Sequence, residues 1–234
     1  FSHLMKYTNR ISHLIDGGQC HAKVALLYNA ESSWAGESES NILACRELTR
    51  NQISFVIIPS DVFEDRDYFK TKFNSDTNTL EINGIKFESL VISGSEFITK
   101  PVAEFINESH GSFPVIFTKQ HPIGVSDCSA RKSNKLIENI DKYLVTDVKD
   151  LPKALDNFIA RDVILEDTFA DLTVYHYKNK EDVFILLNES PSEVFERSLV
   201  FPSKNLLSKA NRVVEYDAWW NELYSLKTKD SDLG

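Results

Sequence analysis

Hydrophobic residues recur at helical spacing over the first sixteen residues of the chain. Their spacing predicts an amphipathic helix over residues 2–16, and Gly17 and Gly18 then supply the left-handed residue that commonly ends helices. The apolar positions of this stretch are Phe1, Leu4, Met5, Tyr7, Ile11, Leu14 and Ile15. An apolar helix face needs a partner, and sequence upstream in a longer parent protein is one candidate.

Continuous apolar runs then alternate with amphipathic segments as far as residue 160. Four runs predict buried strands, because a strand covered on both faces loses its period-two alternation: 22–28, 53–59, 89–93 and 113–118. Helices are expected at 38–51, at 60–70 with Ser60 or Asp61 as N-cap, at 100–109 and at 147–160. The helix at 38–51 should turn Ile42, Leu43, Cys45 and Leu48 inward. Asn83 and Gly84, between two alternating runs, predict a type I′ hairpin.

Strands that alternate with helices indicate a parallel sheet with helices on both faces. About five strands cannot close a (βα)8 barrel, so we predict an open α/β sheet of flavodoxin-like order over residues 19–160. Beyond residue 161 the segments become short, strand-like and separated by turn residues, which predicts a small antiparallel β-domain over 161–228 and a frayed tail at 229–234. The strand-like segments are VILEDT, ADLTVYHYKN, EDVFILLNES, ERSLVFPS, RVVEYDA and ELYSL.

Composition and net charge limit the classes of molecule that this protein is expected to bind. Hydrophobic residues make up 42% and charged residues 26% of the 234, as in ordinary globular proteins, and the net charge is −9. Such an acidic surface repels polyanions, so we expect no nucleic acid and no membrane partner. Cys20, Cys45 and Cys128 are odd in number and widely spaced, which indicates a reducing, cytoplasmic location rather than a disulfide framework.

Motifs for catalysis, cofactors and metals are missing from the sequence. It contains neither GxGxxG nor a P-loop, so no nucleotide cofactor is expected. It has no CxxC or HxxxH spacing, so no metal is expected either. The fourth predicted strand is followed by Lys119, Gln120 and His121, with no serine or cysteine where a nucleophile elbow would carry one. We therefore predict no catalytic residue in this chain.

The polar stretch after the first predicted strand is the strongest candidate site. Open α/β sheets bind ligands at the carboxyl ends of their strands. Glu31 and Glu37 could be an acid–base pair, but they lie six residues apart in one loop, and nothing fixes the separation that glycoside hydrolysis needs. We expect ligand or interface contacts instead, with Trp34 as an interface residue. The candidates at this edge are Asn29, Glu31, Trp34, Glu37, Glu96 and His121.

Two aromatic features lie in the predicted β-domain. His176 alternates with Tyr175 and Tyr177, which favours a cross-strand pair over a functional role. Trp219 and Trp220 are adjacent, so on a strand they would point to opposite faces, and at most one would be core. Packing against a neighbouring domain is favoured over a sugar-binding platform.

Several stretches together resemble parts of a known enzyme family. FSHLMKYTNRISHLIDGG with AKVALLYNAESSWAGE resembles the segment that follows the catalytic barrel in bacterial glycoside hydrolases of the β-galactosidase-like type. ISFVIIPSDVF, LEINGIKFESLVISGSEFI and GSFPVIFTKQHPIG are similar to the class I glutamine amidotransferase-like domain, which serves as the trimerisation domain there. TVYHYKNKEDVFILLNESPSE and VVEYDAWWNELYSL resemble the small β-domain that follows it.

The resemblance implies a non-catalytic, C-terminal portion of a glycoside hydrolase. Residues 1–18 would then trail from an upstream catalytic barrel, which would be the principal partner; a homo-oligomer and carbohydrate bound by the parent enzyme are further implied partners. Lys119 and Gln120 stand where an amidotransferase carries its cysteine, so that activity is not implied. The alternative is a stand-alone flavodoxin-like protein, an enzyme or a small-ligand-binding domain, with its site at the carboxyl edge of the sheet.

Overall fold

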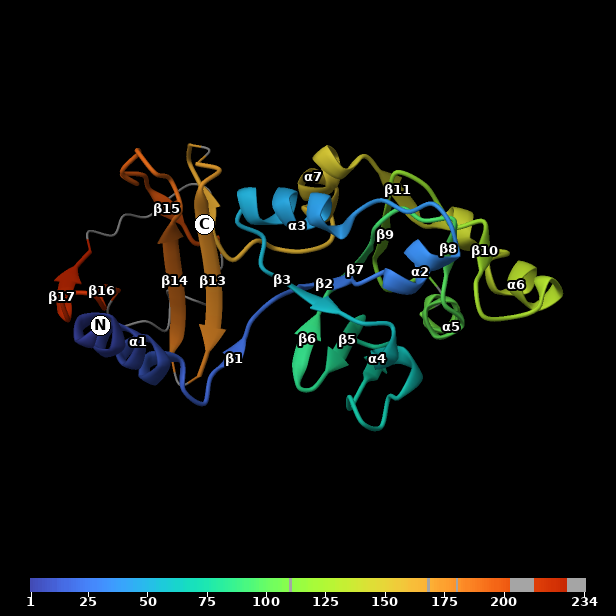
Figure 1. Ribbon diagram of the computed structural model, residues 1–234, viewed down its shortest axis with the longest axis horizontal. Helices are drawn as coiled ribbons and strands as arrows, with labels where there is room; N and C mark the ends of the chain where they lie inside the picture. The colour runs from blue at the N-terminus through green and yellow to red at the C-terminus, as the bar shows by residue number, and fades with distance from the viewer. Residues whose placement is uncertain (110, 168, 180, 203–212, 227–234) are drawn as a thin grey trace. The chain divides into compact units, whose positions relative to one another are not determined.

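The computed structural model describes residues 1–109, 111–167, 169–179, 181–202 and 213–226 (Figure 1). The chain divides into two compact units: unit 1 comprises Phe1–His21 and Ala160–Gly234, and unit 2 comprises Ala22–Ile159. The sequence-based domain boundaries remain predictions, and the predicted tail at 229–234 lies outside the described residues. Within the described residues, no helix combines the length and apolarity that a membrane crossing requires.

A parallel five-stranded sheet forms the centre of unit 2. Its strands are β2 (Val24–Leu27), β3 (Phe55–Ile58), β7 (Ser89–Ile92), β9 (Val115–Thr118) and β11 (Leu144–Thr146). The order is β11-β9-β7-β2-β3, with every neighbouring pair parallel. The first strand lies between the second and the third, so the strand order reverses there, as in flavodoxin-like folds. The predicted fold class is confirmed.

Helices cover both faces of this sheet (Figure 1). On one face lie α3 (Asn41–Arg50) and α7 (Leu151–Leu155), and on the other α4 (Asp61–Glu64) and α5 (Lys100–Glu108). The first face buries Val24, Leu26, Ala44, Leu48, Val91, Ile116, Leu151 and Leu155 together. The second face carries an aromatic group in which the rings of Phe63 and Phe105 stack at 4.6 Å. Both faces of the sheet are therefore buried, which explains the continuous apolar runs of β2, β7 and β9.

The remaining elements of unit 2 are short. An antiparallel sheet joins β4 (Lys72–Asn74), β5 (Thr79–Ile82) and β6 (Ile85–Phe87), and β8 (Phe97–Ile98) pairs in parallel with β10 (Gly124–Val125). The helices are α2 (Ala30–Ala35), α6 (Ala130–Leu136) and the 3-10 turns η1 (Ile140–Lys142) and η2 (Val148–Asp150). Asn83 and Gly84 have φ of 49° and 85° between β5 and β6, so the predicted type I′ hairpin is confirmed.

Several sequence-based details of unit 2 were wrong. The run at 53–59 was expected to be buried, but β3 is an edge strand and Ile57 is 48% exposed. Ile42 was expected to point inward but is 72% exposed, and Ala44 is buried. Both errors share a cause, since apolar character alone does not reveal a sheet edge or the phase of a helix.

Two predicted helices were too long, and one strand of the parallel sheet was missed. The helix expected at 147–160 is the turn η2 followed by α7, and the helix expected at 60–70 is the four-residue α4 followed by turns. Strand β11 escaped the sequence analysis because its three residues are exposed or half-buried and lack a strong apolar run.

Unit 1 contains the amphipathic helix and three small antiparallel sheets. Helix α1 spans Ser2–Ile15, as predicted. The six strand-like segments of the β-domain all contain strands, and β1 adds a further strand from the start of the chain. The sheets are β1 (Gln19–Cys20) with β13 (Leu172–Lys178) and β14 (Asp182–Asn188), β12 (Ile164–Leu165) with β15 (Leu199–Val200), and β16 (Val214–Asp217) with β17 (Glu222–Ser225). Their core gathers Val163, Phe169, Leu172 and Val174.

The turn between β16 and β17 contacts α1. The Arg10 Nη1 atom donates to the carbonyl oxygens of Ala218 and Trp219 at 2.9 and 3.1 Å, and the His3 ring lies 4.7 Å from that of Trp219. Trp219 and Trp220 lie in this turn, not on a strand, and are 40% and 65% exposed. The expected strand placement was therefore wrong, whereas the expectation that at most one of the two is a core residue agrees with their exposure. Helix α1 thus has a contact within its own unit.

Candidate functional site

The candidate site predicted from the sequence lies at the carboxyl ends of β2 and β7, where the strand order reverses. Asn29 follows β2 and is 5% exposed, and Ser93 follows β7 and is fully buried. Asn29 Nδ2 and Ser93 Oγ have no hydrogen-bond partner among the described residues. Buried polar atoms of this kind are uncommon in native proteins, so this edge carries unused hydrogen-bonding capacity.

Hydrogen bonds join two loops of unit 2 at this edge, the loop that follows α2 and the loop that follows β7. The Glu39 amide donates to the Gly94 carbonyl at 2.6 Å, and the Glu96 amide donates to the Glu37 carbonyl at 2.9 Å. The Thr118 hydroxyl joins both loops to β9, because it donates to the Glu39 carboxylate and accepts from the Gly94 amide. The chain's own segments thus occupy the position where an open α/β sheet would present a ligand site.

The predicted carboxylates have separate neighbours. Glu31 Oε1 accepts a hydrogen bond from Ser60 Oγ at 2.9 Å. The Glu37 backbone amide donates to Glu96 Oε2 at 3.1 Å. The expectation that both residues lie in one loop was wrong, because Glu31 is on α2 and Glu37 follows it. Their contacts go to different parts of unit 2 and do not arrange the two carboxylates around a shared substrate. Glu37 and Glu96 are brought together; their role as ligand or interface residues remains a prediction.

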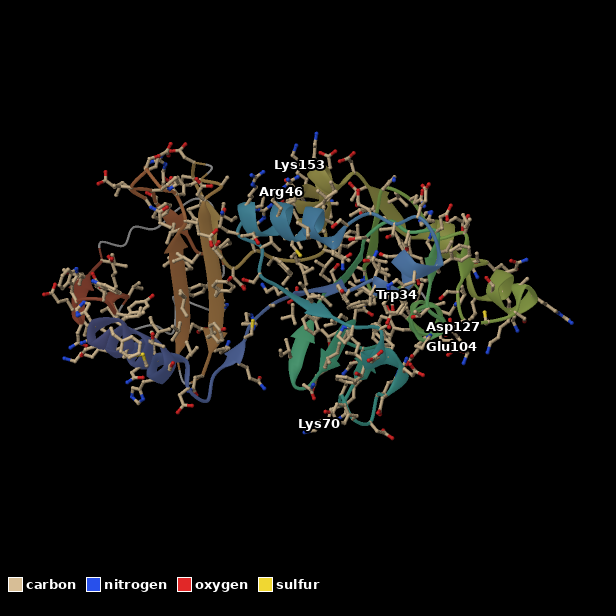
Figure 2. All side chains as sticks on the ribbon, viewed as in Figure 1. Trp34, Arg46, Lys70, Glu104, Asp127 and Lys153 are labelled. Carbon is tan, nitrogen blue, oxygen red and sulfur yellow. The ribbon has the colours of Figure 1, made fainter. Side chains whose placement is uncertain are left out.

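His121 and Trp34 lie in different surroundings. His121 Nε2 donates to the Tyr143 carbonyl at 2.9 Å, and its ring contacts that of Phe117 at 5.3 Å. Trp34, on α2, is 84% exposed (Figure 2). A large aromatic side chain with this exposure is the clearest contact candidate of the predicted set.

The turn after β9 has a strained backbone but no nucleophile. Lys119 adopts φ of 62°, the left-handed conformation that is costly for residues with a Cβ. A nucleophile elbow uses such a sharp turn to present serine or cysteine, and here the position holds a lysine. Burial raises the pKa of the Cys20 and Cys45 thiols, which lowers their thiolate fraction at neutral pH. Neither thiol is activated for attack.

A second polar cluster lies in unit 1 and was not predicted. His21, Asp162 and His176 each offer a ligand atom, and these atoms lie within 4.8 Å of one another. The sequence analysis assigned His176 to a cross-strand pair; it does pair with Phe184, but its ring is 1% exposed and lies between Asp162 and Asp182. No signal in the sequence could have found the cluster, because it depends on the register of β1 against β13, which sets His21 beside His176.

Comparison with known proteins gives a structural likeness but no sequence match. No protein-family model matches the chain, and no curated protein sequence matches it. The chain is similar to the structure of a rhamnosidase from Novosphingobium sp. PP1Y. The TM-score is 0.51 at 16% sequence identity, and the match covers 80% of this chain and 19% of the rhamnosidase chain. At this identity the likeness shows the fold, and the chain spans about a fifth of its neighbour's length.

Proposed function

We propose that this chain is a non-catalytic portion of a glycoside hydrolase, which braces a catalytic barrel and mediates domain or subunit contacts. One observation carries the proposal: four fifths of the chain matches a segment that makes up only a fifth of a rhamnosidase. The β-galactosidase-like resemblance of the sequence supports the same enzyme class. The amidotransferase-like domain type is part of this proposal.

The chemistry of unit 2 supports a non-catalytic role. The turn after β9 presents Lys119 instead of a nucleophile. The Glu31 carboxylate accepts a hydrogen bond from Ser60, whereas Glu37 contacts Glu96 through its backbone amide. The carboxyl edge of the sheet is closed by hydrogen bonds between its own loops. A catalytic site would instead need aligned reactive groups around space for a substrate.

Exposed apolar side chains support a role in contacts. Several large apolar side chains are exposed on each unit, and exposed aromatic side chains such as Trp34 are common contact residues at interfaces. Unit 2 exposes Trp34, Ile42, Ile57, Tyr68 and Ile123, and unit 1 exposes Phe1, Leu4, Val194, Trp220 and Leu223. The partner we assign to them is the catalytic barrel or a second subunit.

The alternative is a stand-alone flavodoxin-like protein that binds a small ligand at the carboxyl edge of the sheet. The unpartnered Asn29 Nδ2 and Ser93 Oγ atoms favour it, because a ligand's polar groups could satisfy them. The hydrogen bonds of the Glu39 and Glu96 amides count against it, because they hold the neighbouring loops together at this edge.

An activity assay tests the main proposal. We expect residues 1–234, purified alone, to hydrolyse no member of a panel of aryl glycosides, including an aryl rhamnoside, above the enzyme-free rate. The matched variants Glu31→Gln and Glu37→Gln identify a contaminating hydrolase, because the activity of a contaminant would be the same in both variants as in the unmodified chain. Turnover by the purified chain that either variant abolishes would refute the non-catalytic assignment.

A further inference from the structure

We propose that His21, Asp162 and His176 of unit 1 form a Zn²⁺ site. Their ligand atoms lie within 4.8 Å of one another, and His176 Nδ1 lies 3.2 Å from Asp162 Oδ2. In a tetrahedral zinc site with bonds of about 2.0–2.2 Å, neighbouring ligand atoms are about 3.3–3.6 Å apart. The His176–Asp162 pair already has nearly this spacing, and modest side-chain rotation would bring the His21 ring into range.

The backbone brings the two histidines together. Strand β1 pairs with β13 in the register Gln19 to Lys178 and Cys20 to Tyr177, and the His21 amide continues this ladder by donating to the His176 carbonyl at 2.8 Å. The two rings consequently meet at 4.6 Å. Asp162 arrives from the segment that precedes β12, so three separate stretches of chain converge on one point.

Asp182 supplies the outer support that a metal-bound histidine usually has. Its Oδ1 atom lies 2.9 Å from His176 Nε2. With Nε2 donating its proton to this carboxylate, Nδ1 is the ring nitrogen left to bind the ion, and it lies 3.2 Å from Asp162 Oδ2. Histidines that bind metals commonly donate their other ring N–H to a carboxylate, which fixes the tautomer and raises ligand basicity.

The surroundings favour a fixed site over a loose surface cluster. The His176 ring stacks on Phe184 at 4.2 Å with an interplanar angle of 18°, and Phe201 packs against Phe184 at 4.9 Å. His176 is 1% exposed. Aromatic packing on the ring face limits rotation, so the nitrogen positions are held before any ion binds.

A purely structural interpretation would have Asp162 and Asp182 hold the His176 ring through hydrogen bonds, with the His21 ring packed edge-on against it at 4.6 Å. The zinc interpretation also gives the His21 ring a ligand role, because its ligand atom lies within 4.8 Å of those of the other two residues. Two imidazoles and one carboxylate form a donor set suited to Zn²⁺, whereas Ca²⁺ and Mg²⁺ prefer all-oxygen sites. Water would complete the tetrahedron.

The site would act as a clamp within unit 1. His21 is the last residue of the unit's first segment, and Asp162 lies just after the chain returns at Ala160. A bound ion would tie these two segments to β13. Closing such a long chain separation with a metal stabilises the folded unit, because it removes freedom that the unfolded chain otherwise has.

Zinc binding to the full 234-residue chain tests this inference independently of the proposed function. Zn²⁺ is titrated into the apo chain against a chromophoric chelator, and bound metal is measured after dialysis. We expect one Zn²⁺ per chain, at least tenfold weaker binding in His21→Ala and Asp162→Asn, and roughly tenfold weaker binding in Asp182→Asn. His13→Ala removes an exposed histidine of α1 and should bind as the unmodified chain does.

A second measurement separates loss of ligand from loss of fold. Saturating Zn²⁺ should raise the Tm of the unmodified chain and of His13→Ala, but not that of His21→Ala, which removes a partly exposed side chain and spares the buried His176. The inference is overturned if the unmodified chain retains no stoichiometric Zn²⁺. It is equally overturned if His21→Ala and Asp162→Asn bind Zn²⁺ as tightly as His13→Ala.

Discussion

Replacing Phe105 with alanine is expected to lower the free energy of unfolding by about 3–5 kcal/mol. Phe105 is fully buried between the parallel sheet and α4, where its ring stacks on Phe63 and meets Phe73 and Phe113 edge-on at 5.8 Å each. The substitution removes apolar contact with all three rings and leaves a cavity that the surrounding helices and strands can only partly fill.

Chemical denaturation followed by circular dichroism measures this loss. Phe158→Ala is the matched control, since the same atoms are removed from a side chain that is 43% exposed, and its cost should stay below about 1.5 kcal/mol. Equal losses in the two variants would show that the aromatic group on the α4–α5 face does not stabilise unit 2 as described.

Gly94→Ala is the second substitution with a large expected effect, about 3 kcal/mol of destabilisation. A Cβ at Gly94 would lie well inside 3.0 Å of the Thr118 carbonyl oxygen, a backbone atom that cannot rotate away. Relief of the clash would move the end of β9 or the loop after β7. Either movement disturbs the hydrogen bonds that Gly94 makes with Thr118 and Glu39.

Denaturation and amide hydrogen exchange test this expectation together. The amides of Glu39 and Glu96 should exchange faster in Gly94→Ala, because their bonds close the carboxyl edge. Gly111→Asn is the control: a Cβ there meets open space, and asparagine tolerates its φ of 74°, so a cost under about 1 kcal/mol is expected. Unchanged stability and exchange in Gly94→Ala would contradict the tight closure of this edge.

The sequence predicted the fold class and the central strands, but not the position of every strand in the sheet. Strands β2, β7 and β9 are buried at every residue, and their continuous apolar runs predicted them. Strand β3 has the same kind of run but lies at the sheet edge, which depends on the strand order and not on its own composition. Strand β11 has no such run, and its place is determined by pairing with β9.

The site residues also fall into two groups, those whose position the sequence predicts and those that depend on contacts between distant segments. The segment from Asn29 to Glu37 could be placed at the carboxyl edge, because parallel strands all end on one side of their sheet. Its partners Ser60 and Glu96 come from other parts of unit 2, and no local pattern reveals them. The cluster of His21, Asp162 and His176 was out of reach for the same reason, since it depends on the register of a two-residue strand.

The native polypeptide that carries this sequence tests the central claim most directly. After isolation from its source, its intact mass is measured by mass spectrometry, and its hydrolysis of aryl glycosides is measured on the same sample. The proposed function predicts a polypeptide several times longer than 234 residues that hydrolyses a glycoside, while the 234-residue chain alone does not. A native polypeptide close to 234 residues, or a longer one with no glycosidase activity, would contradict the account and favour the stand-alone ligand-binding protein.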